Sequence, residues 1–154
     1  MPRKPAAIQN RRKQPCFNHK EKLMTGETDL DKLLAAISPA LLPDEYVFCT
    51  VQGEYGDFQQ LAPLACFREA EGLTLVISKA AALAGNLPFE SVFKAITLTV
   101  HSSLDAVGLT AAVATKLAAK GISANVIAAY YHDHIFVQAE KANAAIQALD
   151  EFRR

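Results

Sequence analysis

The sequence predicts an α+β fold made of two small, related units, and three observations support this prediction. The chain has 154 residues, which is enough for one domain or two very small ones, and its apolar fraction of 51% allows a packed core. The second half follows the order β-α-β-β-α, which is a split βαβ unit without its last strand. The first half has the order α-β-β-β, a second incomplete version of the same unit, so we expect the two units to complete one another or to share a sheet.

The first half is expected to begin with a helix. Thr28–Asp31 has the form of a capping box, with a hydroxyl followed three residues later by an acid. Pro39 and Pro43 are expected to stop the helix. The apolar residues in this stretch follow helical spacing and are Leu30, Leu33, Leu34, Ile37 and Leu41.

Three strands are expected next, because β-branched and aromatic residues cluster between turn signals. The turn signals are the Gly53–Asp57 region and the tight turn at Glu71–Gly72. One helical turn is expected at residues 79–85, and Gly85–Pro88 marks the boundary between the two halves. The three strands are expected at residues 45–51, 62–69 and 73–77.

The second half has a clearer pattern. Residues 94–101 alternate two unlike faces, as a strand does, and residues 108–120 keep a helical period. Gly121 is expected to be the left-handed residue after that helix. The remaining elements are expected to be a strand at 122–131, a turn at 132–134, a strand at 135–139 and a helix at 142–152.

The zero net charge of the chain conceals a marked asymmetry. Residues 1–22 hold seven basic side chains and one acid, so this segment carries +6 and the remainder carries −6. A body of that charge has no general attraction for nucleic acid, so we expect no nucleic-acid partner for it. The basic segment is either an electrostatic arm for nucleic acid or anionic lipid, or a flexible leader before Met24, where the character of the sequence changes.

Several classes of protein are excluded by what the sequence lacks. No apolar run reaches the ~18 residues that a membrane span needs, and no secretory signal opens the chain. Three scattered cysteines argue against a disulfide framework and favour the reduced cytoplasm. No activated nucleophile, phosphate loop or dinucleotide fingerprint is present, so we expect neither catalysis nor a cofactor.

The turn at Asp105–Leu109 is the most informative candidate site. The amide groups at the start of a helix lack internal partners and carry a partial positive charge, so they can hold a carboxylate. Gly108 has no Cβ and permits close approach, and Asp105 could accept an amino group. Such a site suits a zwitterion. The alternative is that Asp105 is an ordinary N-cap and Gly108 only eases packing.

Two further features are candidates for ligand or metal binding. Asn125 lies on an otherwise apolar strand and could face a ligand across a subunit contact, or could simply be a solvent-facing residue at a sheet edge. The sequence His132–Asp133–His134 offers zinc or nickel ligands if a third group such as His101 converges on it. Otherwise it is a hairpin turn in which Asp133 tolerates the bend.

From Gly108 onward the residues resemble an ACT domain, a regulatory module found beside many enzymes of amino-acid metabolism. The pattern consists of a strand, the acid-containing loop Ser103–Leu109, Gly121 after the helix, and Ile122–Asn125 entering the next strand. Residues 24–154 as a whole are similar to small stand-alone bacterial proteins with tandem ACT domains. The segments that carry this similarity are Thr25–Leu30, Glu45–Thr50, Phe67–Thr74 and Tyr131–Val137.

The resemblance implies ferredoxin-like ACT units in tandem, with antiparallel sheets and helices packed on one face. Together with the charge pattern and the boundary at Gly85–Pro88, it gives a basic flexible extension at residues 1–23, a first, incomplete unit at 24–89 and a second unit at 90–154. The resemblance also implies binding of a small molecule and pairing of units, and we expect an amino acid as the ligand and a homodimer as the assembly. The expected ligand-binding residues are Ser102, Ser103, Asp105, Val107, Gly108, Leu109 and Asn125.

The resulting hypothesis is a non-enzymatic regulatory protein that senses an amino acid at the strand–helix turn. Two alternatives remain open. One is a structural or interaction module without a ligand, which is favoured by Ala106–Val107 standing where ligand-binding ACT domains often carry a proline before the glycine. The other is a metal-responsive protein that uses His132–Asp133–His134.

Overall fold

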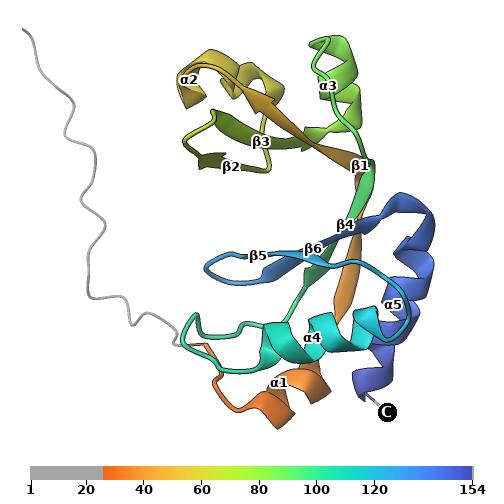
Figure 1. Cartoon of the computed structure of the whole chain (residues 1–154). Helices are drawn as coiled ribbons and strands as arrows, with labels where there is room; N and C mark the ends of the chain where they lie inside the picture. The colour runs from red at the N-terminus through yellow and green to blue at the C-terminus, as the bar shows by residue number, and fades with distance from the viewer. Residues whose placement is uncertain (1–25, 154) are drawn as a thin grey trace, which may run out of the picture.

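The computed structural model describes residues 26–153, so the basic segment at residues 1–22 lies outside the described residues (Figure 1). The elements in chain order are α1 (Leu30–Ala36), β1 (Pro39–Val51), α2 (Tyr55–Phe58), η1 (Gln59–Leu61), β2 (Ala65–Arg68), β3 (Leu73–Ser78), α3 (Lys79–Ala84), β4 (Phe93–Leu98), α4 (Leu109–Ala118), β5 (Asn125–Ala128), β6 (Asp133–Gln138), η2 (Ala139–Lys141), α5 (Ala142–Asp150) and η3 (Glu151–Arg153).

All six strands belong to one antiparallel sheet with the order β2-β3-β1-β4-β6-β5. The long strand β1 holds the two halves of the sheet together. Its first residues, Pro39–Leu41, pair with the end of β4, whereas residues 46–51 pair with β3. The strand that the second half lacks is therefore supplied by the first half of the same chain.

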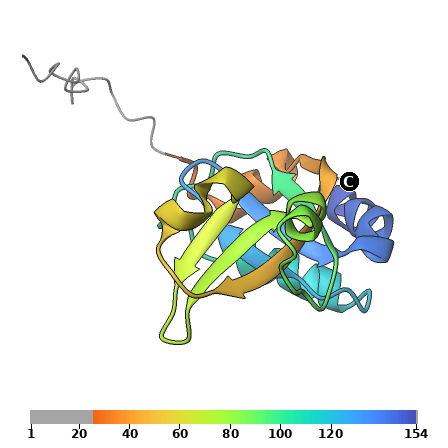
Figure 2. The ribbon, with the colours of Figure 1, turned by 90° about the horizontal axis from the view of Figure 1, so that it is seen from above.

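The helices cover one face of this sheet, and the sheet bends so that they lie on the outside of the bend (Figures 1 and 2). Helices α1, α4 and α5 pack on β4 and β6 around a core that includes Leu33, Ile96 and Leu149. Helix α3 packs on β1 and β3 around Val47, Leu75 and Ala82. The structure confirms the expected α+β, ferredoxin-like architecture with helices on one face.

The opposite face of the sheet is free of helices, and its two halves turn toward each other. Phe136 of β6 contacts Tyr46 and Phe48 of β1 edge to face, with ring centroids 6.0 and 5.4 Å apart. Phe48 makes a similar contact with Phe93 of β4 at 5.4 Å. These aromatic contacts, together with the buried Val76 and Ala95, form a third core where the sheet bends, and we call this bend on the helix-free face the crease.

The prediction that Leu41 belongs to the apolar stripe of the first helix is wrong, because Leu41 lies in β1. Helix α1 ends at Ala36, and β1 begins at Pro39, which pairs with Leu98. A proline can occupy the first position of a strand because its missing amide is not needed there. The register shifts between Leu41 and Glu45, so Pro43 also falls where no ladder bond is required.

Three local predictions also need correction. The N-cap of α1 is Asp29, whose carboxylate accepts a bond from the amide of Lys32, and not Thr28. The turn region after Gly53 folds into α2 and η1, because Glu54 and Asp57 form a reciprocal capping box. The last hairpin bends at residues 130–131, before His132, since the amide of Ala129 donates to the His132 carbonyl.

Helix α4 ends as the sequence predicts. Gly121 has φ +67°, and the amide of Ile122 donates to the carbonyl of Leu117 at 3.0 Å. This bond keeps Ile122 in the core between α4 and the sheet. The strand β5 therefore starts at Asn125 and not at the expected residue 122.

We predict that Phe136→Ala lowers the free energy of unfolding by about 3–5 kcal/mol, because the ring is fully buried and leaves a cavity at the crease. Urea denaturation followed by circular dichroism measures this. Leu83→Ala on α3, where the side chain is 62% exposed, is the control and should change stability by less than about 0.5 kcal/mol. Equal effects of the two substitutions would contradict the packing of the helix-free face.

Candidate functional site

The connection from β4 to α4 holds the candidate site. Gly108 is the N-cap of α4 and has φ +101°, a conformation that glycine adopts without strain. No side chain among the described residues caps α4, whereas Asp29 caps α1 and Ser78 caps α3. The first amides of α4 are thus not bonded by a capping side chain, and they carry the partial positive charge of a helix start.

The predicted site residues differ in accessibility. Asp105 is exposed and Val107 is 84% exposed, whereas Ser102 and Leu109 are buried. Because the N-cap is Gly108, Asp105 does not cap the helix, and its carboxylate is not committed to that role. The hydroxyl of Ser103 accepts a bond from the Asp105 amide at 3.2 Å, which fixes the start of the loop.

A preceding segment of the chain lies along this loop. Glu27 forms a parallel bridge with Ser102, and its carbonyl accepts a bond from the Ser103 amide at 2.9 Å. The approach at Gly26 is so close that a Cβ there would lie 2.4 Å from the Ser103 nitrogen. The protein's own backbone therefore uses the Ser103 amide, and any ligand must bind farther along, toward Gly108.

The side chain of Leu30, the first residue of α1, covers Gly108. A Cβ at Gly108 would lie 3.0 Å from Cδ2 of Leu30. The sequence pattern placed Leu30 on an apolar helical stripe, but nothing local to residues 102–109 indicated that α1 would pack there. This neighbour of the candidate site comes only from the tertiary structure.

Asn125 is not gathered with the other predicted site residues in one chain. The candidate turn follows Leu98, which lies level with Ala128 because both residues pair with Asp133. Asn125 pairs with Phe136 at the other end of β5, far from the turn. Its amide nitrogen donates to the Phe136 carbonyl at 3.3 Å. Asn125 instead borders a cavity on the helix-free face.

The His132–Asp133–His134 sequence is divided between different environments. Asp133 and His134 are successive residues of β6 and so point to opposite faces of the sheet. His134 lies 3.0 Å from the Thr97 hydroxyl, and Nδ1 of His132 lies 3.3 Å from the Val100 carbonyl. Within residues 26–153, no group of three histidine, cysteine or acidic side chains is arranged to hold a metal ion.

Burial shifts the pKa of Asp133 and that of His134. Burial raises the pKa of Asp133, although the adjacent histidines oppose that change. Burial lowers the pKa of His134, so its ring favours the neutral form. Both groups lie on β6, one strand away from β4, which leads into the candidate loop.

Comparison with known proteins adds independent observations. Models of the ACT domain match residues 25–94 and residues 90–151. No match is found among the curated proteins. In the part of the chain that the structure describes, no helix is long and apolar enough to cross a bilayer.

The solved structures that are similar to this chain include the following three. A Vibrio cholerae protein of unknown function, described as a possible transport protein, is 59% identical, with 81% of this chain and 96% of that chain covered and a TM-score of 0.76. The regulatory subunit of aspartate kinase from Thermus thermophilus, in its ligand-free form, is 14% identical, with coverage of 75% and 97% and a TM-score of 0.55. Aspartokinase III from E. coli, in complex with aspartate and ADP, is 11% identical, with coverage of 75% and 33% and a TM-score of 0.57. The last two similarities concern the fold alone.

We predict that Asp133→Asn stabilises the protein at neutral pH. A carboxyl group whose pKa is raised on folding contributes its full stability below its unfolded value of 3.8 and loses it as the pH rises through the folded value. The asparagine avoids that loss, so its advantage should shrink as the pH is lowered toward about 4.

Thermal unfolding across this pH range measures the effect, with Asp31→Asn, which removes an exposed carboxylate from α1, as the control. A variant that is less stable than the parent at neutral pH would show that ionised Asp133 has a stabilising partner.

Proposed function

Since the chain belongs to the ACT-domain family and carries two such domains in tandem, we propose that it is a non-enzymatic regulatory protein that binds an amino acid at the amino end of α4. ACT domains are regulatory modules, which supports the general class of the proposal. The observation that supports this position is the start of α4 at Gly108, where no side chain caps the helix and Asp105 is exposed nearby.

The chemistry of this turn matches a zwitterion. The α-carboxylate of an amino acid would accept bonds from the amides that follow Gly108, where the helix dipole favours negative charge. Its ammonium group would pair with Asp105, the acid of the connecting loop. Leu30 and Val107 would then form the apolar surroundings of the amino-acid side chain.

We further propose that two chains associate through this end of the molecule, in the cytoplasm. Val107 and Leu104 of the loop are 84% and 63% exposed, and the nearby hairpin exposes Tyr130 and Tyr131. The ring of His101 contacts that of Tyr131 in a tilted arrangement, with centroids 5.1 Å apart, so loop and hairpin form one surface. Exposed apolar clusters of this kind are typical of protein–protein contacts. A second copy could also bring its Asn125 to the ligand.

The alternative of a ligand-free structural module has one specific observation in its favour. The Glu27 segment already occupies the Ser103 amide and lies along the first part of the loop. In this alternative, residues 26–30 would take the place of a ligand, and the turn would serve packing alone. Titration with amino acids distinguishes the two functions.

We predict that isothermal titration against the twenty amino acids detects binding of at least one. Asp105→Asn should weaken that binding by about tenfold, because it removes the charge that pairs with the ammonium group. Gly108→Ala should weaken it to a similar extent, because the added methyl group crowds the Leu30 side chain beside the amides.

Gly121→Ala is the matched control. It places a Cβ at another positive φ, at the opposite end of α4, where nothing lies within 4 Å. It should add backbone strain at a positive φ without crowding a neighbour, and it should leave binding unchanged. No heat with any amino acid at several-millimolar concentration would refute the proposal and favour the structural module.

The proposed association gives a separate prediction. Size-exclusion chromatography with light scattering should give the mass of two chains, and Val107→Glu should reduce it to one, because a charge would be buried at the contact. Leu83→Glu, at a similarly exposed leucine on α3, should leave the mass unchanged. A parent protein that is already a monomer at high concentration would rule out the dimer.

A further inference from the structure

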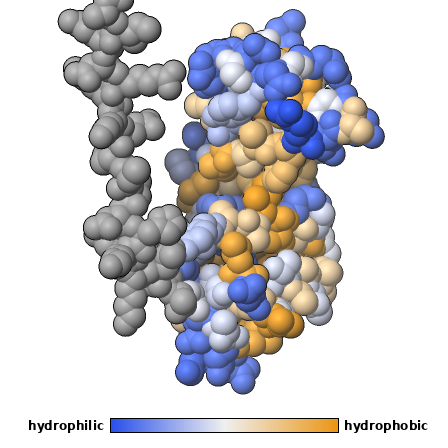
Figure 3. All heavy atoms as spheres, turned by 90° about the vertical axis from the view of Figure 1, so that its left-hand side faces the viewer, coloured by the Kyte–Doolittle hydropathy of each residue, from blue (hydrophilic) through white to orange (hydrophobic). Residues whose placement is uncertain are grey.

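A groove on the helix-free face is not explained by the proposed function, which uses only Asn125 at its border. It consists of two adjoining cavities of about 440 and 780 Å³, which share Phe48 and Thr50 of β1. Figure 3 shows an apolar band across the middle of the molecule, between more hydrophilic ends. We name the two cavities together the crease groove. The residues of the smaller cavity are Phe48, Thr50, Pro88, Phe89, Glu90, Ser91 and Phe93.

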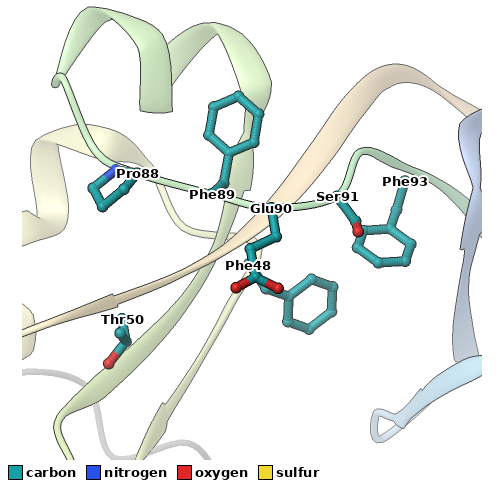
Figure 4. Close-up of a pocket in the computed structure, with 7 residues that line it drawn as sticks. All are labelled: Phe48, Thr50, Pro88, Phe89, Glu90, Ser91 and Phe93. Atoms are coloured by element: carbon teal, nitrogen blue, oxygen red, sulfur yellow. The ribbon is translucent and has the colours of Figure 1, made fainter.

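The smaller cavity combines aromatic rings with a carboxylate. Figure 4 shows the Glu90 side chain reaching from the connection before β4 toward the ring of Phe48, with Phe93 and Ser91 close by, whereas Phe89 points away. The faces of aromatic rings attract cations, and a carboxylate at the same place adds to that attraction.

The nearby cations of the protein are engaged elsewhere. Arg68, at the rim of the larger cavity, is paired with Glu54 at 2.6 Å. Lys94 follows Phe93, and its ammonium group donates to the carbonyl of Pro43 at 2.5 Å. Among the described residues, Glu90 forms no ion pair, so its charge is open to a cation from outside.

A second, independent observation is an unpartnered acceptor on the same face of the sheet. Oε1 of Gln138 is buried and has no hydrogen-bond partner within the described residues. Gln138 is the cross-strand partner of Phe93 and shares the helix-free face with it. Gln138 lines neither cavity, but its unpaired oxygen adds partial negative charge to the helix-free face next to Phe93.

The charge distribution of the chain disfavours an anion here. Residues 26–89 contain nine acidic and three basic side chains, whereas residues 90–154 contain six of each. The half that supplies most of the groove therefore carries −6. A field of that sign raises the local concentration of cations and opposes anions.

We propose that the crease groove binds a small organic ammonium ion with an apolar body. The ammonium group lies between Glu90 and the rings of Phe48 and Phe93, and the apolar body extends past Thr50 toward Phe67 and Ile127 in the larger cavity. This site is separate from the turn at Gly108 and differs from it in chemistry, because it offers no helix start to a carboxylate.

Occupation of this site has a structural consequence. Phe67 lies on β2 and Ile127 on β5, the two edge strands of the sheet, so a ligand that contacts both bridges the two halves across the bend. Such a ligand favours the conformation in which the two halves lie close together.

The test uses phenethylamine, which joins an ammonium group to an apolar ring. We expect calorimetric titration to show binding, and 2-phenylethanol and phenylacetate, which are neutral and negative, to bind at least about fivefold more weakly. Glu90→Gln should weaken phenethylamine binding by about five- to tenfold, while Asp31→Asn, an exposed acid on α1, should not change it.

Two outcomes would overturn the proposal. One is an affinity for 2-phenylethanol equal to that for phenethylamine, and the other is an affinity for phenethylamine that Glu90→Gln does not change. Phe93→Leu, which retains the apolar volume, should also weaken binding of the amine more than binding of the alcohol. Gly108→Ala should leave phenethylamine binding unchanged. Because Gly108→Ala is expected to weaken only amino-acid binding, the two titrations of this variant separate a failure of the crease groove from a failure of the proposed amino-acid site.

Discussion

The pairing of β1 with two different partners is the constraint on which the rest of the structure depends. Its first residues complete the half-sheet of β4, β6 and β5, and its last six residues pair with β3, the middle strand of the half-sheet that β1 forms with β3 and β2. Neither half can satisfy its backbone hydrogen bonds without this strand. The missing strand of the second half therefore has one explanation, because β1 of the first half pairs with both β3 and β4.

The shared strand also explains why the candidate turn and the crease groove are built from distant parts of the chain. Because β1 runs beside β4, the segment before it reaches the loop after β4, so Glu27 and Leu30 lie against residues 102–108. Because the sheet bends at β1 and β4, the aromatic residues of its helix-free face meet at the crease. One site is polar and lies at a helix start, and the other is aromatic and acidic.

The sequence predicted elements well where local and long-range preferences agree. Helix α4 has an apolar stripe and a closing Gly121, and its core packs as that stripe requires. The first part of β1 was missed because two prolines indicated a chain break and Leu41 continued the helical spacing of α1. The pairing of Leu41 with Ile96 outweighs that local signal. The glycine start of α4 was predicted, but the contact with Leu30 was not, because it depends on how the two halves join.

The register shift between Leu41 and Glu45 has an evolutionary consequence. A strand that serves two partners would ordinarily transmit any insertion or deletion to both, turning every inward side chain outward. The irregularity at Pro43 divides the pairing of β1 with β4 into two stretches, Pro39–Leu41 and Glu45–Tyr46, of which only the second continues into the pairing with β3. A change of length within residues 42–44 could therefore alter the alignment of Pro39–Leu41 with β4 and leave the residues that pair with β3 in place.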